Sequence, residues 1–99
     1  MPAYVIVHVE VTDWDKYNEY LKAGPGTLAR YGGKFIARNG EKTTLEGPEE
    51  TRRMIILKFP SLAKAKEWYN SKEYQNAKKL RAGASIGSLV AIEGVEANQ

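Results

Sequence analysis

Cysteine is absent from this chain of 99 residues, and histidine occurs once. Without cysteine the chain has no disulfides, thiolate metal sites or thiol catalysis, and its composition fits a reducing compartment. One histidine and scattered carboxylates show no metal-ligand spacing, so we expect neither a metal nor another cofactor. The N-terminal residues lack the pattern of a signal peptide. We therefore expect a cytoplasmic protein.

Long apolar runs are also missing, since none approaches the roughly 18 residues that a membrane-spanning helix needs. We therefore expect no membrane partner. The net charge is +3, and basic residues gather between positions 64 and 81. Such residues can follow phosphates, but Glu67 and Glu73 interrupt them here, as on a solvated helix face. The chain has no recognisable nucleic-acid motif, so we expect no nucleic-acid partner.

What is present is the composition of a globular protein, with 42% hydrophobic and 27% charged residues. A chain of this length forms one domain with one modest core. We assign this domain to residues 1–95 and expect a loose C-terminal tail at residues 96–99.

Two stretches, residues 4–11 and 52–59, have the pattern of β-strands that are apolar on both sides. In the first, the period-2 rule puts four valines on one face and Tyr4, Ile6, His8 and Glu10 on the other. Strands that are apolar on both sides are usually central in a sheet and covered on both faces. Two further strands are expected at residues 34–38 and 88–93.

Residues 12–31 have the apolar spacing of a helix. Pro25 interrupts it, because a proline inside a helix removes a hydrogen bond and clashes with the preceding turn, at a cost of about 3 kcal/mol. We expect a break near Ala23. A second helical region follows Ser61, its N-cap. We expect Asn70 to start a new segment there, with Glu73 completing a capping box.

The segment after residue 38 is open to two interpretations. Asn39-Gly40 is a strong hairpin signal, which would pair residues 34–38 with residues 42–46. Alternatively, one long strand is bent by a bulge at Asn39-Gly40, and the hairpin lies at residues 47–50. We favour the second interpretation, because residues 42–46 make a weak partner strand.

The order of elements is strand, helix, strand, strand, helix, strand. It predicts an α+β, ferredoxin-like βαββαβ fold, in which a four-stranded antiparallel sheet carries both helices on one face. The first and third strands are central in that fold, which agrees with their apolar pattern. The other face of the sheet would expose a large apolar patch, which monomers rarely tolerate. We therefore expect a homodimer that packs sheet against sheet.

Four stretches carry a resemblance that covers nearly the whole chain: AYVIVHVEVTD, TLARYGGKF, RRMIILKFPS and AKEWYNSKEYQNAKKLR. The chain resembles a family of small proteins of uncharacterised function within the dimeric α+β-barrel superfamily. That superfamily includes cofactor-free monooxygenases, lactone-forming isomerases and haem-binding relatives. The resemblance implies the fold and a pocket between the helices and the sheet, but no reaction. Gly24-Pro25-Gly26 departs from the adjacent prolines that such chains more commonly carry.

Four residues are candidates for binding a ligand: His8, Arg53, Tyr74 and Arg81. Tyr74 and Arg81 share a helical face, and an aromatic ring beside a guanidinium suits a planar carboxylate or phenolate. The alternative is that Tyr74 packs on the sheet while Arg81 pairs with a carboxylate. His8 could transfer protons, or it could be a partly buried histidine with a hydrogen-bonded neighbour. We predict that His8, Tyr74 and Arg81 approach one cavity.

Arg38 is a further anion-binding candidate, with a solvated strand-end charge as the alternative for it and for Arg53. Two hypotheses for the function remain. The first is a dimeric module that binds a small molecule, aromatic or acidic, between helices and sheet. The second is a cofactor-independent enzyme of monooxygenase or isomerase type that uses His8 or a tyrosine as base.

Overall fold

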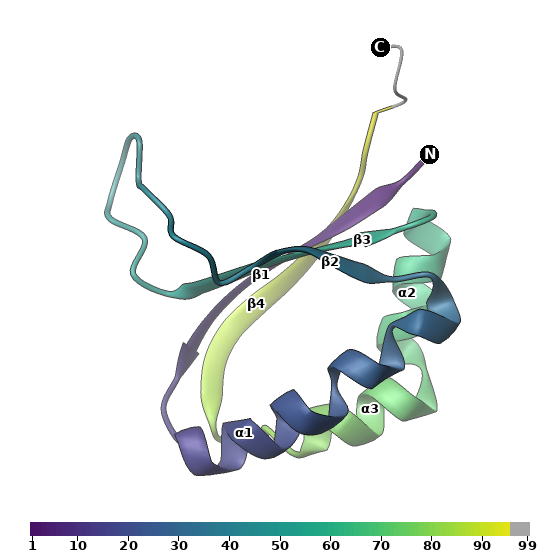
Figure 1. The fold of residues 1–99 in the computed structure, drawn as a ribbon, viewed down its shortest axis with the longest axis horizontal. Coiled ribbons are helices and arrows are strands. Elements are labelled where there is room, and N and C mark those ends of the chain that lie inside the picture. Colours follow the sequence, from purple (N-terminus) through teal and green to yellow (C-terminus); the bar gives the residue numbers. More distant parts are fainter. Residues whose placement is uncertain (96–99) are drawn as a thin grey trace.

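The computed structural model describes residues 1–95, which form one antiparallel sheet covered by helices on one side (Figure 1). The strands are β1 (Ala3–Val11), β2 (Lys34–Arg38), β3 (Arg53–Phe59) and β4 (Ser85–Glu93), in the sheet order β2-β3-β1-β4. The helices are α1 (Trp14–Ala23), α2 (Leu62–Asn70) and α3 (Lys72–Lys79). This is the predicted ferredoxin-like α+β fold, with β1 and β3 in the middle of the sheet.

The first helix begins at Trp14, two residues after the predicted start, and ends at the predicted break near Ala23. The Asp13 carboxylate accepts a hydrogen bond from the Lys16 amide, and α1 stops at Ala23, two residues before Pro25. Two short 3-10 turns, Pro25–Thr27 and Ala29–Tyr31, continue the chain. Gly32 then takes a left-handed conformation with φ of 73°, which ends the helical region.

The division between α2 and α3 lies one residue later than predicted. Asn70 is the last residue of α2, and Ser71 is the N-cap of α3. The Ser71 hydroxyl donates to the Trp68 carbonyl and accepts from the Tyr74 amide, so one buried side chain ends one helix and starts the next. The predicted capping box from Asn70 to Glu73 is therefore wrong.

The segment between β2 and β3, residues 39–52, contains no strand. Both interpretations of this segment are therefore wrong, since neither a partner strand at 42–46 nor one long bent strand forms. The irregularity in the β2–β3 pairing lies instead between Phe35 and Ala37. We call residues 39–52 the arm, because in Figure 1 it extends away from the helices beyond the ends of β2 and β3.

The core lies between the helices and the sheet. Alternate residues of the two central strands point into it, and aromatic side chains from the helices fill it; its largest fully buried side chains are Tyr74 and Phe59. Within residues 1–95, no helix has the length and apolarity needed to cross a membrane. The predicted tail at residues 96–99 lies outside the described residues.

Candidate functional site

A small hollow, with a cavity volume of about 60 Å³ and partly open to solvent, lies between α1, α2 and the sheet. Aromatic and aliphatic side chains form most of its wall, and two arginines, Arg38 and Arg53, supply its charge. Pockets for small molecules commonly combine an apolar wall with a few polar groups. The prominent wall residues are Tyr17, Tyr20, Phe35, Ile55, Leu57 and Trp68.

Arg53 is the most unusual group in this wall. It begins β3 and pairs with Val9, so its side chain projects to the helix-covered face, where its guanidinium lies 5.4 Å from the centre of the Trp14 ring. No hydrogen-bond acceptor within residues 1–95 contacts its buried Nε. A buried donor without a partner costs about 1–3 kcal/mol. The site therefore lacks an acceptor that a bound anion could supply.

Arg38 lies on the same wall at the end of β2. It pairs with Ile55, two residues along β3 from Arg53, and its guanidinium stacks over the Phe35 ring at 4.2 Å. Unlike Arg53, it is exposed to solvent. The two arginines thus place positive charge on the largely aromatic and aliphatic wall of the hollow, Arg38 exposed to solvent and Arg53 with a buried Nε.

A second hollow adjoins the first, and both are lined by Val7, Tyr17, Tyr20 and Leu89. Arg81 contributes to the second hollow, with its guanidinium 5.1 Å from the centre of the Tyr20 ring. The Arg81 Nη2 also donates to the Tyr74 hydroxyl at 3.3 Å. The sequence therefore predicted correctly that Tyr74 and Arg81 face the same way.

Tyr74 itself is fully buried and lines neither hollow. Its hydroxyl lies 2.9 Å from that of Tyr20, and its ring packs 4.2 Å from the Trp68 ring, centre to centre. Tyr74 thus positions Tyr20 and Arg81 through its buried hydroxyl, without lining either hollow. A role for Arg53, Tyr74 and Arg81 in binding a ligand stays a prediction.

Burial keeps the hydroxyls beside the first hollow protonated. It raises the pKa of Tyr17, although the charges of Arg53 and Arg81 oppose this effect in part. Burial and the neighbouring Tyr74 hydroxyl together raise the pKa of Tyr20 far above its usual range. Both side chains are therefore hydrogen-bond donors near neutral pH, and neither is prepared to act as a base.

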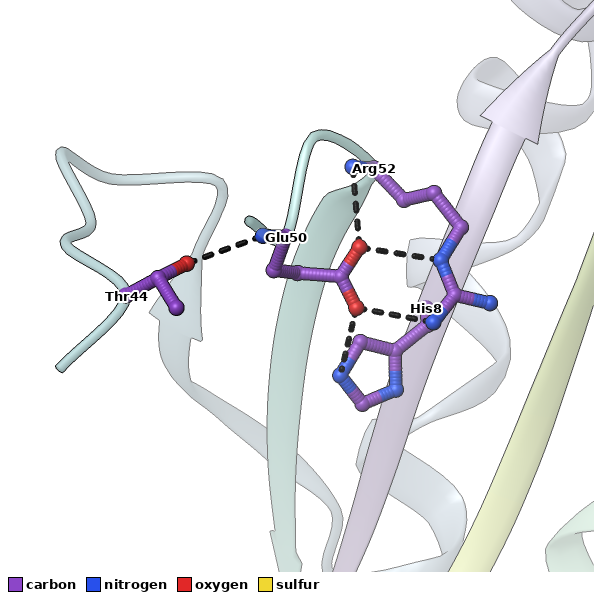
Figure 2. A network of polar contacts seen from close by, with 4 residues as sticks. All are labelled: His8, Thr44, Glu50 and Arg52. Carbon is purple, nitrogen blue, oxygen red and sulfur yellow. Dashed lines mark hydrogen bonds and ion pairs between the residues drawn. The ribbon is translucent and has the colours of Figure 1, made fainter. Parts of the chain in front are cut away.

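His8 does not join this site. It alternates with Val7 and Val9, which face the helices, and it pairs with Met54 and Ser88 on the opposite face of the sheet. Its Nε2 lies 3.6 Å from the Glu50 carboxylate, as Figure 2 shows. The prediction of one cavity shared by His8, Tyr74 and Arg81 is therefore wrong.

The carboxylate beside His8 is held mainly by Arg52. Glu50 accepts hydrogen bonds from the backbone amide, Nε and Nη2 of Arg52, at 3.1, 3.0 and 2.7 Å (Figure 2). These bonds lower the pKa of Glu50 to about 2. Within residues 1–95, no three His, Asp or Glu side chains gather in a way that could hold a metal ion.

Sequence reasoning missed the part that Tyr17 and Tyr20 play at the site. Their spacing of three residues on one helix places them on a common face. Tyr20 falls outside the apolar pattern that predicted α1. The sequence signal that could have identified them is a pair of tyrosines three residues apart on a helix that faces the core.

Solved structures of similar fold span most of this chain. A protein of unknown function from Rhodopseudomonas palustris is 21% identical, with a TM-score of 0.74, over 96% of this chain and 83% of that one. SnoaB, a cofactor-independent oxygenase from Streptomyces nogalater, is 8% identical, with a TM-score of 0.66, over 96% and 94% of the two chains.

A dimeric protein of unknown function and ferredoxin-like fold from Bacteroides fragilis is 17% identical, with a TM-score of 0.56, over 94% and 96% of the chains. At these identities the likeness shows the fold alone. Comparison with curated proteins gave no match. The family described as "Domain of unknown function (DUF1330)" matches residues 2–95. The match spans the ferredoxin-like domain almost from end to end, and the chain therefore belongs to the DUF1330 family.

Proposed function

We propose that this protein is a homodimer in which each subunit binds a small aromatic acid between its helices and its sheet. The observation that carries the proposal is the buried Arg53 Nε, which has no acceptor within residues 1–95. A carboxylate is the partner whose planar geometry best matches a guanidinium. It would satisfy the unpaired donor without adding uncompensated charge.

The wall of the hollow supports an aromatic body for this acid. Tyr17, Phe35 and Trp68 surround the space next to Arg53. Flat rings gain about 0.5–1.5 kcal/mol from offset or edge-on contacts beyond the area that they bury. The Tyr20 hydroxyl, which lies 2.9 Å from that of Tyr74, is a further polar group in the same wall. A benzoate-like molecule, with its carboxylate at Arg53, therefore fits the chemistry of the site.

The open face of the sheet supports the homodimer. Across β3, β1 and β4, Ile56, Ile6 and Val90 form one apolar row, because Ile6 pairs with both of the other residues. Other large apolar side chains on this face are Tyr4, Met54, Ile86 and Ile92. A second copy that packs sheet against sheet would cover them. The Bacteroides fragilis protein of the same fold is described as dimeric, which supports self-association here.

A cofactor-independent enzyme is the second candidate, and the fold shared with SnoaB, a cofactor-independent oxygenase, favours it. Neither predicted base fits well, since His8 lies on the other face and burial raises the pKa of Tyr17 and Tyr20. An enzyme at this site would instead stabilise an anion that the substrate already carries, through Arg53 and Arg81. We also propose a cytoplasmic location, from the cysteine-free composition.

Titration with benzoate, salicylate and cinnamate, followed by the fluorescence of Trp14 and Trp68, tests the proposed site. Arg53→Met is expected to weaken binding about 10- to 100-fold, the scale of a charge-assisted hydrogen bond of about 1.5–3 kcal/mol. Arg52→Met is the matched control, because Arg52 is the next residue along the chain but binds Glu50. Equal affinity in wild type and Arg53→Met, or no binding of any of the three acids, would overturn the proposal. Loss of a bound acid with time, or uptake of oxygen, would support the enzyme.

A further inference from the structure

The arm, residues 39–52, is the part of the described chain that neither the core nor the candidate site explains. Irregular loops of this length, about 12–15 residues or more, are uncommon in compact domains and usually functional. Leu45 lies in it with 94% of its surface exposed. A leucine displayed so fully at a protruding loop suggests a contact that the single chain does not provide.

The base of the arm is fixed on the open side of the sheet. The Glu50 carboxylate is held by Arg52 and lies 3.6 Å from His8, whose side chain belongs to the open face. The Glu50 amide donates to the Thr44 hydroxyl at 2.8 Å, which ties the two sides of the arm together. Figure 2 shows these contacts together. The backbone next to Leu45 is thus held in place by hydrogen bonds before any partner binds. Less conformational entropy is then lost on association.

The arm's charge and position both point to a second copy of this chain. Residues 41–49 contain three glutamates and one lysine and carry a net charge of −2, whereas the whole chain carries +3. A second sheet packed on the open face would lie about 10 Å above it, beside the base of the arm. The arm is continuous with the surface that we assign to the dimer.

We propose that the arm of each subunit packs against the other subunit, with Leu45 in apolar contact with it. This inference rests on the homodimer of the proposed function, but not on the ligand. In a two-fold dimer the contact occurs twice. A substitution at Leu45 therefore removes two contacts from each dimer, and both losses raise the dissociation constant. Burial of a leucine side chain is strong enough that its loss should raise the dissociation constant at least about tenfold.

A photo-crosslinking amino acid at position 45 of the full chain tests the contact. Illumination is expected to give a species of two chains, with the crosslink in the partner's sheet or arm. The matched control carries the same amino acid at position 80, since Leu80 is partly exposed but follows α3 in the helical layer. Sedimentation of the same samples gives the oligomeric state.

The strength of the contact is then measured from the dissociation constants of the Leu45→Ser and Leu80→Ser dimers, obtained by dilution. Leu45→Ser is expected to raise the dissociation constant at least about tenfold, with Leu80→Ser unchanged. A dimer without a crosslink from position 45, or with unchanged affinity in Leu45→Ser, would overturn the role of the arm alone. A monomer at micromolar concentration would overturn the homodimer itself, and the arm's role with it.

Discussion

The two faces of the sheet are built from alternate residues of the same strands, yet they carry different chemistry. The face under the helices combines aromatic rings with two arginines around a hollow, and the Tyr20 hydroxyl is hydrogen-bonded to that of Tyr74. The open face carries aliphatic side chains in rows and has charged groups at both ends, Glu50 beside His8 toward the arm and Lys34 and Lys58 at the opposite end. A charged group inside an aromatic wall suits a small polar ligand, whereas an aliphatic surface suits another protein surface.

The largest expected effect comes from the helix-covered face. Leu57→Ala should lower the free energy of unfolding by about 2–5 kcal/mol, because Leu57 is buried at the centre of β3 and its removal leaves a cavity. Lys66→Ala, at an exposed position of α2, should change it by no more than about 0.5 kcal/mol. Urea unfolding followed by circular dichroism measures both. Equal losses in the two variants would contradict the assignment of the core face.

A smaller effect is expected from the carboxylate beside the open face. The hydrogen bonds from Arg52 lower the pKa of Glu50 from 4.5 to about 2. Its contribution to stability is therefore fully present above about pH 4.5 and is lost as the pH falls toward 2. The unfolding midpoints of wild type and Glu50→Gln should differ at pH 7 and converge near pH 2. Glu46→Gln, at an exposed position of the arm, is the control. A difference between the two unfolding midpoints that stays constant with pH would show that the Arg52–Glu50 interaction does not need the ionised carboxylate.

Most of the fold could be predicted from the sequence because its signals are local. Alternating apolar residues identified β1 and β3, and Pro25 fixed the end of α1. The arm could not be predicted, because Asn39-Gly40 and Gly47-Pro48 are competing turn signals. Its conformation depends on contacts of Glu50 with residues elsewhere, including His8 on β1.

The site was only partly predictable for a related reason. The alternation of β1 separated His8 from the valines, but both faces of the strand are apolar, so the sequence did not tell which face the helices cover. The fully apolar valine row proved to be the covered one. Arg53 faces the hollow because it pairs with Val9 on the neighbouring strand. No local sequence pattern encodes this register.

The most direct test of the division between the two faces is sedimentation equilibrium of wild type, Val90→Asp and Arg53→Met at the same micromolar concentration. Val90 is 59% exposed on the open face, midway along the edge strand β4, and Arg53 lies on the helix-covered face. Wild type and Arg53→Met are predicted to have twice the chain mass of 11.1 kDa, and Val90→Asp that of one chain, with an unchanged circular dichroism spectrum. A dimeric Val90→Asp variant, or a monomeric Arg53→Met variant, would contradict the account.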